Sequence, residues 1–361
     1  MKTLIIVVLL VNVCVTPVFA GWAVTSLHPY PTGTMESVAR GVSDNQQVGE
    51  LTAPDFGHAV LWNGTAQSWV DLHPLRPGVT ESGAYATSGG YQVGYADVNH
   101  STHASLWNGT STSWIDLNPT GSTLSQSYNI SDGKQVGYAV TDGSNPHAGM
   151  WYGTSTSWVD LNPAGWNMSS IHGISGNQQV GWVRDYPIMN ASLWYGTADS
   201  WVNLNPAGVS DSQAVDVADG QQVGYASFNN RQHASLWSGT SASWVDLHPA
   251  GAYASYATGV SGGYQVGWAN INGLRASLWH GTSDSWVDLN EFLPEGVYSG
   301  SQAEDIYVAN SEIWVVGRAY NETNSRVEAI LWHYNPVPEP SSLLALCGGV
   351  SGLLAFRRRR K

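Results

Sequence analysis

Histidine recurs in the sequence at regular spacing, and its imidazole could do chemistry. Four histidines precede the alanine of a recurring motif: His58, His103, His147 and His233. The equivalent positions of three other repeats hold Asn190, Arg275 and Glu328. A ring of imidazoles could bind a metal ion. Because sites one repeat apart rarely come within ligand distance, we predict that each histidine bonds a neighbouring strand or turn, with no metal or cofactor.

Aspartate recurs in a second motif, Ser-Trp-Val-Asp-Leu. Five repeats carry it, at Asp71, Asp116, Asp160, Asp246 and Asp288, whereas a sixth holds Asn203. Paired carboxyl groups about 5–10 Å apart could catalyse glycoside hydrolysis. These aspartates belong to different repeats, so we expect them to bond turn amides or the histidine of the same repeat. Motifs of the Gly-x-Ser-x-Gly and His-Glu-x-x-His kind are absent from the sequence, and we predict no catalytic residue.

Two tryptophans recur in fixed register in most repeats, which favours core packing between neighbouring repeats over sugar binding. Trp166 is different, because it lies in a loop outside that register. Tyr186 also lies in a variable loop. We predict that these two side chains are exposed carbohydrate contacts.

These residues are positioned by a repeat of about 43 residues. A Val-Gly signature, usually Gln-Val-Gly, places valine at Val48, Val93, Val136, Val180, Val223, Val266 and Val316, with intervals of 45, 43, 44, 43, 43 and 50 residues. Each unit contains four short segments rich in Val, Trp, Tyr and Leu and bounded by turn residues. Unit length and strand number are typical of a four-stranded propeller blade.

The strand count predicts how the ring closes. The last unit stops at Trp332–Pro336 without its fourth strand, whereas Ala23–Pro29 matches the end of a fourth strand such as Ser243–Pro249. A strand supplied from the other end of the chain removes the unpaired edges that an open array would leave. We therefore predict an all-β fold, a seven-bladed β-propeller closed by the N-terminal strand, over residues 21–335.

The connections within a unit differ between the two faces of the predicted ring. First–second and third–fourth turns are uniform from unit to unit, whereas second–third and fourth–first connections vary in length and chemistry. Loops that vary on a rigid scaffold usually carry recognition. We predict that the variable face, around the mouth of the central channel, is the binding face.

Both chain ends have the composition of targeting segments. Residues 1–20 combine Lys2, an apolar stretch and small residues before Gly21, which predicts a cleaved secretory signal peptide; a permanent N-terminal anchor is the alternative. Residues 336–361 contain the apolar stretch Ser341–Phe356 and the basic run Arg357–Lys361. This pattern predicts a transmembrane helix with a cytoplasmic tail and an exported body.

The C-terminal segment resembles the PEP-CTERM sorting signal. Val337, Pro338, Glu339 and Pro340 precede the apolar stretch and the basic run in the order typical of that family. The resemblance implies an exopolysaccharide-producing bacterium, an exosortase-like processing enzyme as partner, and removal of the tail during export. An ordinary single-span anchor is the alternative. The repeats also resemble extracellular HAF repeats, although His103–Trp107 carries Ser where that family has Phe, and no activity follows from this resemblance.

Composition excludes several classes of function. Six of the 14 basic residues lie at the chain ends, so the body keeps eight against nearly all 27 acidic residues, and nucleic acid is a poor partner. Cys14 and Cys347 both lie in the terminal segments. We therefore expect an exported protein of the cell surface or exopolysaccharide matrix that binds a glycan or a surface protein.

Two alternatives to this function remain. The first is a propeller polysaccharide lyase or glycosidase, which would need unrepeated acids, histidine or tyrosine converging at the channel mouth. The sequence alone reveals no such cluster. The second is a purely structural matrix component.

Overall fold

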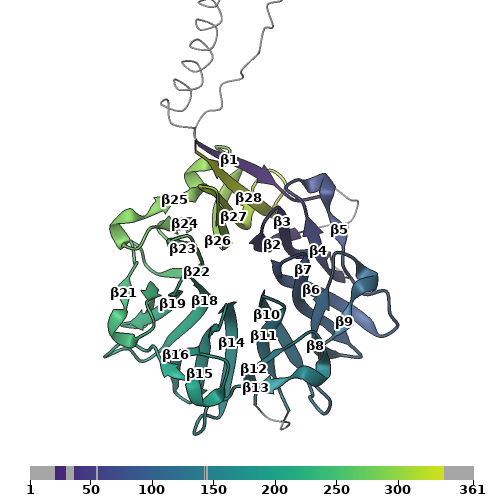
Figure 1. The fold of residues 1–361 in the computed structure, drawn as a ribbon. Helices are drawn as coiled ribbons and strands as arrows, with labels where there is room; N and C mark the ends of the chain where they lie inside the picture. The colour runs from purple at the N-terminus through teal and green to yellow at the C-terminus, as the bar shows by residue number, and fades with distance from the viewer. Residues whose placement is uncertain (1–20, 30–35, 54–55, 142, 144, 337–361) are drawn as a thin grey trace, which may run out of the picture.

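The structure, a computed structural model, describes residues 21–29, 36–53, 56–141, 143 and 145–336. Within them the chain forms seven four-stranded antiparallel sheets arranged as blades around a central axis (Figure 1). This confirms the predicted all-β, seven-bladed propeller. The predicted signal peptide and most of the sorting segment, with its helix, lie outside the described residues. In the described ranges, no helix has the length and apolar character needed to cross a membrane.

Each blade runs from an innermost first strand to an outermost fourth strand. Blades 1 to 3 consist of β2 (Glu36–Ser43), β3 (Gln46–Ala53), β4 (Phe56–Trp62) and β5 (Val70–Asp71); β6 (Val79–Ser88), β7 (Tyr91–Val98), β8 (Ser101–Trp107) and β9 (Ile115–Asp116); and β10 (Ser125–Ser131), β11 (Lys134–Ala139), β12 (His147–Trp151) and β13 (Val159–Asp160). Blades 4 and 5 consist of β14 (Met168–Ser175), β15 (Gln178–Asp185), β16 (Ile188–Trp194) and β17 (Val202–Asn203); and β18 (Ser212–Ala218), β19 (Gln221–Phe228), β20 (Arg231–Trp237) and β21 (Val245–Asp246). Blade 6 consists of β22 (Ser255–Ser261), β23 (Tyr264–Asn270), β24 (Leu274–Trp279) and β25 (Val287–Asp288).

The seventh blade is assembled from both ends of the body. It contains β26 (Tyr298–Ala309), β27 (Glu312–Asn321), β28 (Arg326–Asn335) and, as its outermost strand, β1 (Gly21–Ser26). β1 pairs with β28 in an antiparallel ladder that runs from Gly21 opposite Asn335 to Ser26 opposite Ile330. Trp22 adds a ring contact of 5.7 Å with Phe292. The N-terminal strand therefore occupies the place that the sequence predicts for it.

The repeated glycine of the second strand is required by a bulge in the first strand. A β carbon on Gly49 would lie 1.9 Å from the carbonyl oxygen of Val38, and one on Gly94 would lie 1.9 Å from that of Gly83. No larger residue fits where the two backbones approach this closely. The Gln-Val-Gly signature thus marks the bulge opposite it.

The repeated glutamine holds the third–fourth turn. The Oε1 atom of Gln92 accepts the N–H of Gly109 at 2.8 Å, and Gln47, Gln135, Gln179, Gln222 and Gln265 repeat this contact in their own blades. These side chains are buried. Each turn contains one short 3₁₀ segment of the same length: η1 (Ala66–Ser68), η2 (Ser111–Ser113), η3 (Ser155–Ser157), η4 (Ala198–Ser200), η5 (Ser241–Ser243) and η6 (Ser283–Ser285). This face of the ring is therefore uniform.

The connections on the opposite face differ from blade to blade. Two residues join β7 to β8, whereas residues 140–146 join β11 to β12, and a short 3₁₀ segment, η7 (Leu289–Phe292), lies between β25 and β26. Most other second–third connections are also short, so the variation lies more in residue type than in length.

The third-strand tryptophans form the core between blades. Seven of these side chains have no exposed surface: Trp62, Trp107, Trp151, Trp194, Trp237, Trp279 and Trp332. Trp107, for example, packs with Ala59 and Leu61 of the preceding blade. The fourth-strand tryptophans contribute less evenly to these cores. Trp114 is 6% exposed and belongs to the core between blades 1 and 2, and Trp158, Trp201, Trp244 and Trp286 are partly buried and pack against the other cores, whereas Trp69 is 36% exposed. Several donate their indole N–H to a serine of the third strand, as Trp114 does to Ser105 at 2.9 Å.

Candidate functional site

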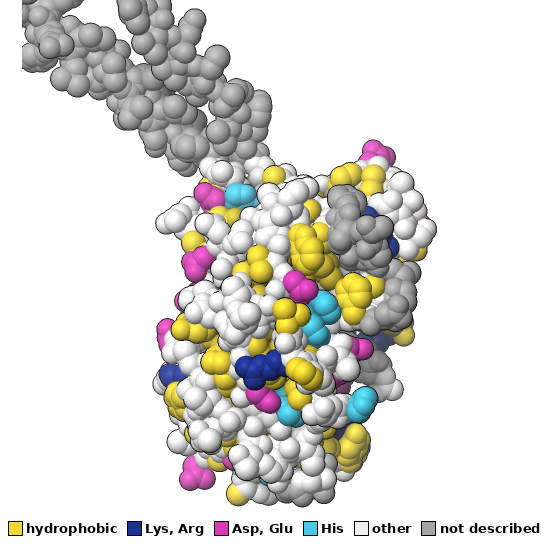
Figure 2. Space-filling view, turned by 90° about the vertical axis from the view of Figure 1, so that its right-hand side faces the viewer, with side chains coloured by type: hydrophobic (Ala, Val, Ile, Leu, Met, Phe, Trp, Pro, Cys, Tyr) yellow, Lys and Arg dark blue, Asp and Glu magenta, His cyan; other side chains and the backbone are white. Residues whose placement is uncertain are grey.

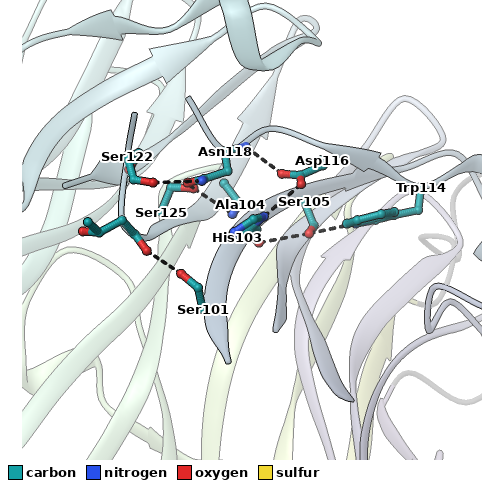
Figure 3. A network of polar contacts seen from close by, with 10 residues as sticks. Ser101, His103, Ala104, Ser105, Trp114, Asp116, Asn118, Ser122 and Ser125 are labelled. Atoms are coloured by element: carbon teal, nitrogen blue, oxygen red, sulfur yellow. Dashed lines mark hydrogen bonds and ion pairs between the residues drawn. The ribbon is translucent and has the colours of Figure 1, made fainter. Parts of the chain in front are cut away.

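The repeated histidines and aspartates pair with each other near the outer edge of the blades. The Nδ1 atom of His103 lies 2.8 Å from Oδ2 of Asp116, whose Oδ1 accepts the N–H of Asn118 at 2.8 Å (Figure 3). The same pairs occur at His58 and Asp71, His147 and Asp160, and His233 and Asp246. These contacts confirm the structural role that the sequence predicts. In the part of the chain that the structure describes, no three His, Cys, Asp or Glu side chains gather as a metal site.

A buried serine fastens each blade to the next. Ser125 accepts the N–H of Ala104 at 3.0 Å and donates to Oδ1 of Asn118 at 2.7 Å (Figure 3). The same serine-to-alanine contact occurs at Ser37, Ser82, Ser169, Ser212, Ser255 and Ser301. Loss of such an acceptor leaves a buried N–H unsatisfied and costs about 1–3 kcal/mol. These polar contacts are therefore part of the scaffold.

Trp166 and Tyr186, the predicted carbohydrate contacts, lie in different surroundings. Trp166 is in the connection between blades 3 and 4, and Tyr186 is in the connection between β15 and β16 of blade 4. Trp166 is partly buried, and its ring centroid lies 5.7 Å from that of Trp201. Tyr186 is 68% exposed, with the Arg184 guanidinium 3.9 Å from its ring centroid. Neither side chain lines the central cavity described next. Their role in binding stays a prediction.

The innermost strands carry a β-bulge at one common position. Its extra residue lies between a pair of registered neighbours in each of seven described strands: Arg40, Tyr85, Tyr128, His172, Val215, Thr258 and Glu304. All seven residues line one cavity of about 310 Å³. Figure 1 shows why they meet, since the first strands of all blades face the centre of the ring. Bulges re-aim side chains, and here they aim one residue of each blade into the channel.

Blades 2 to 4 line this channel with a continuous set of rings, which we call the aromatic arc: Tyr85, Tyr128, Tyr138, His172 and Trp182. Ring centroids of Tyr85 and Tyr128 are 5.5 Å apart, and those of Tyr128 and His172 are 4.4 Å apart with nearly parallel planes. Trp182 donates its indole N–H to Nε2 of His172 at 3.1 Å. The imidazole hydrogen therefore sits on Nδ1 of His172. Burial lowers the pKa of His172 to about 4, so its ring is neutral near pH 7.

The aromatic arc continues toward the face with the varied connections. A second cavity of about 540 Å³ shares Tyr128 and His172 with the first and is also lined by Leu124, Val140 and Pro146 from that face. We call this opening, together with the central cavity, the channel mouth. On the far side, Tyr225, Tyr256 and Trp268 form a further ring cluster with centroid distances of 5.1 and 5.9 Å.

Blades 7 and 1 line the central cavity with Arg40 and Glu304. Each of these contacts a side chain of opposite charge, and we call the four residues the charged sector: Arg40, Glu50, Glu304 and Arg318. Nε of Arg40 lies 3.2 Å from Oε1 of Glu50. Nε of Arg318 lies 3.5 Å from Oε1 of Glu304. Burial raises the pKa of Glu304.

Two aspartates directly after the bulges fasten the innermost strands to each other. Oδ2 of Asp216 accepts the N–H of Val260 at 2.9 Å, and Oδ2 of Asp305 accepts the N–H of Val42 at 2.8 Å. Burial raises the pKa of Asp216 to about 6. Burial also raises the pKa of Asp305, and the neighbouring Asp216 carboxyl raises it further. The two carboxyl groups therefore repel each other when both are ionised.

Sequence reasoning missed this cluster of unrepeated side chains. One signal for it was present. In each first strand a variable position precedes Gly, Ala, Asn or Asp, and in six of the seven strands it follows Ala or Ser; the residue type at this position changes from unit to unit. Arg40, Tyr85 and Glu304 are three examples.

Comparison with known proteins identifies the C-terminal motif. Residues 336–360 match the PEP-CTERM protein-sorting motif, which includes Val337, Pro338, Glu339 and Pro340. This motif indicates an exported protein of the cell surface. No curated protein matches the sequence.

Solved structures match the fold of the body. A puromycin hydrolase matches with a TM-score of 0.56 at 10% identity, over 87% of this chain and 57% of that one. A puromycin-hydrolysing peptidase of Mycobacterium tuberculosis matches with a TM-score of 0.56 at 12% identity, over 84% and 55%. The β-propeller domain of the Trilobed protease from Pyrococcus furiosus, described as having an open velcro topology, matches with a TM-score of 0.54 at 10% identity, over 83% and 95%.

This chain spans little more than half the length of the first two matches. At such low identity the likeness shows the fold alone. The protein thus combines a seven-bladed β-propeller with a PEP-CTERM sorting motif.

Proposed function

We propose that this protein is exported to the cell surface or extracellular matrix, where its propeller binds a glycan chain at the channel mouth. The observation that carries the proposal is the aromatic arc, a set of partly exposed rings in a cavity on a rigid ring of blades. Its members Tyr85, Tyr128 and His172 stand at the bulge position, where the residue type changes from blade to blade. A sugar ring has an apolar C–H face that packs on aromatic rings, and small-ligand sites combine such rings with a few placed polar groups.

The polar groups of the arc are held in place by their own hydrogen bonds. Tyr128 donates its hydroxyl hydrogen to Oε1 of Gln126 at 2.8 Å, and Gln126 donates to the hydroxyl oxygen of Tyr85 at 2.9 Å. Side chains fixed in this way lose little conformational entropy when a ligand binds. The carboxyl groups of Asp216 and Asp305 accept hydrogen bonds from backbone N–H groups and so hold the fold together. For this reason we propose that the site binds a glycan and does not hydrolyse it.

The terminal segments complete the proposal. An exosortase-like enzyme would recognise Val337–Pro340 and remove the tail after export. Tyr186 and Trp166 would add contacts to a longer glycan at the edge of blade 4. The resemblance of the repeats to HAF repeats agrees with an extracellular location.

The test compares glycan binding by residues 21–336, which contain every described strand, with binding by a Tyr128→Ala variant on a glycan array and by calorimetry. Loss of one stacking ring should weaken binding about ten-fold or more. Tyr91→Ala is the matched control, because Tyr91 is an exposed tyrosine at the opposite face, and it should bind as the parent does. Equal binding by the Tyr128 variant would remove the channel mouth as the site.

A further inference from the structure

The body contains seven arginines, and the structure divides them into two groups. Four lie in ion pairs with an acidic side chain: Arg40, Arg275, Arg318 and Arg326. Within the described residues the other three form no ion pair and lie over an aromatic ring instead: Arg76 over Trp114, Arg184 over Tyr186 and Arg231 over Tyr253, with the guanidinium carbon 5.0, 3.9 and 4.6 Å from the ring centroid. A ring contact occupies the face of a guanidinium and leaves the N–H donors at its edge free. Such a side chain can therefore still receive an anion.

Arg184 extends the aromatic arc toward the face with the varied connections. It follows Trp182 by two residues in β15, and residues two apart in a strand point to the same side of the sheet. Its Nε atom is buried and has no hydrogen-bond partner within the described residues. The side chain as a whole is partly exposed, so a ligand can reach its terminal nitrogens. In the described part of the chain, the charge of Arg184 thus stays unpaired beside the proposed glycan site.

The second arginine–tyrosine pair lies at the same face of the next blade. Arg231 begins β20 of blade 5, and Tyr253 lies in the connection from β21 to β22. Both line a cavity of about 410 Å³ together with Asp211, whose Oδ2 accepts the hydroxyl hydrogen of Tyr225 at 3.0 Å. Burial raises the pKa of Tyr225, and the positive charge of Arg184 opposes this rise, so Arg184 acts on the same blade. We call the surface that holds both pairs the arginine edge: Arg184, Tyr186, Arg231 and Tyr253.

The acidic groups near the arginine edge are held by other partners. Asp211 accepts hydrogen bonds from Tyr225 and Ser227 at 3.0 and 3.3 Å. Asp185 accepts one from Asn167 at 2.9 Å. The whole chain has a formal net charge of −13, but salt at physiological concentration largely screens charges more than about 8 Å apart. On the flank of the ring shown in Figure 2, Lys and Arg side chains are few and stand apart, so two unpaired arginines on neighbouring blades are a local feature of the arginine edge.

We infer that the glycan bound at the channel mouth is an acidic saccharide chain whose carboxylate or sulfate groups pair with Arg184 and Arg231; this inference rests on the proposed function. The edge of a guanidinium presents parallel N–H donors that match two oxygens of such a group. Tyr186 is 68% exposed and Tyr253 is 61% exposed, so each ring keeps surface for the C–H face of a sugar. The uncharged sugar faces pack on the aromatic arc.

The experiment offers residues 21–336 a panel of soluble neutral glucans and galactans, each in three forms: unmodified, oxidised at C6 to the uronate, and sulfated. Calorimetry measures the affinity for each form. We expect an acidic form to bind about ten-fold or more tightly than the unmodified polymer, and the form with the larger gain identifies the acidic group. Arg184→Gln and Arg231→Gln should each remove most of this gain and leave binding of the unmodified polymer as in the parent.

Arg76→Gln is the matched control. Arg76 carries the same charge and also lies over a ring at the face with the varied connections, but it belongs to the connection between blades 1 and 2. This variant should bind all three forms as the parent does. Arg184→Lys keeps the charge without the parallel donors, so it should recover only part of the gain that Arg184→Gln removes. The thermal midpoint of each variant checks that it is folded.

The outcomes separate the two claims. Unmodified polymers that bind as tightly as the acidic forms, with binding lost in Tyr128→Ala, would overturn the inference and leave the proposed function in place. An acidic preference that survives both Arg184→Gln and Arg231→Gln would also overturn it. Binding of no form would remove the proposed function and the inference with it. An acidic preference that these two variants lose and Arg76→Gln keeps would support both.

Discussion

Single residues of this protein divide into those that repeat and those that do not. The repeated glycine, glutamine and serine of each unit are fixed by close backbone approach or by buried hydrogen bonds, as at Gly49, Gln92 and Ser125. The bulge residue has no such structural role, because its side chain points into the channel. Residue types that differ between blades are therefore concentrated at positions that the packing of the blades does not constrain.

One repeated position gives the fold a dependence on pH. The side chain that bonds the hydroxyl group of the buried serine is asparagine in four blades and histidine in three: His28, His73 and His248. Nδ1 of His28 lies 2.8 Å from Oγ of Ser37, which itself accepts the N–H of Ala329. The hydroxyl hydrogen of Ser37 is thus left to be donated to His28. Burial, with a smaller contribution from the Arg326 charge, lowers the pKa of His28 from 6.5 to about 4.

This shift predicts the pH dependence of stability. Because the folded-state pKa of His28 lies below its unfolded value, its stabilisation is complete above pH 6.5 and is lost as pH falls toward about 4. The parent should therefore lose about 2 kcal/mol more free energy of unfolding than His28→Asn between about pH 7.5 and about pH 5. Urea titrations at both pH values measure this, and all other titrating groups are common to the two proteins. Parallel losses in both proteins would contradict the assignment.

Among the strands, β1 is the one that we expect to contribute most to the stability of the closed ring. β1 brings both ends of the body into one sheet, and Trp22 and Val24 pack against the core of the last blade. An edge left without β1 would expose the N–H and C=O groups of β28. The ring is closed by hydrogen bonds between the two ends and not by a covalent link.

Deletion of residues 21–26 should destabilise the body by about 3 kcal/mol or more, since it removes a ladder of hydrogen bonds and the burial of two apolar side chains. The midpoint of thermal or urea unfolding measures the effect. A chain ended after Pro336 is the matched truncation and should unfold at the midpoint of the chain that keeps residues 337–361. A deletion variant with an unchanged midpoint would show that β1 does not hold the ring closed.

At the scale of the whole molecule, the two ends of the body leave the ring opposite the channel mouth. Gly21 pairs with Asn335, so both lie at one corner of the seventh blade. Asn335 ends a third strand and therefore lies at the face of the third–fourth turns. The apolar stretch of the sorting segment starts at Ser341, five residues after Pro336. If the tail is held in a membrane, we expect the face of the third–fourth turns to lie nearer the membrane than the channel mouth does.

This orientation predicts unequal labelling on cells that retain the tail. In a chain with Cys347→Ser, a cysteine replacing Tyr186 should react several-fold faster with a bulky impermeant maleimide than one replacing Tyr91. The reason is that Tyr186 lies at the face of the channel mouth and Tyr91 at the opposite face, and both are exposed in the isolated body. The purified body should remove the difference. Equal rates on cells would contradict the orientation.

The sequence by itself determined the number of strands and blades and the way the ring closes. Those features depend on local turn chemistry and on a period of about 43 residues, both of which are visible in one chain, and the spare strand at Ala23–Pro29 completed the count. The sequence also indicated that His103 and Asp116 make structural bonds rather than hold a ligand, because equivalent residues of neighbouring repeats rarely come within ligand distance.

Only the tertiary structure decided which side chains form the channel mouth. Arg40, Tyr128 and Glu304 come from units far apart in the sequence and meet because the closed ring turns every first strand toward one axis. The direction of their side chains depends on a bulge, a one-residue shift in strand pairing. The Gln-Val-Gly signature marks this bulge only when the strand that pairs with it is known. Convergence of this kind is a property of the ring, so it cannot be assigned from any single repeat.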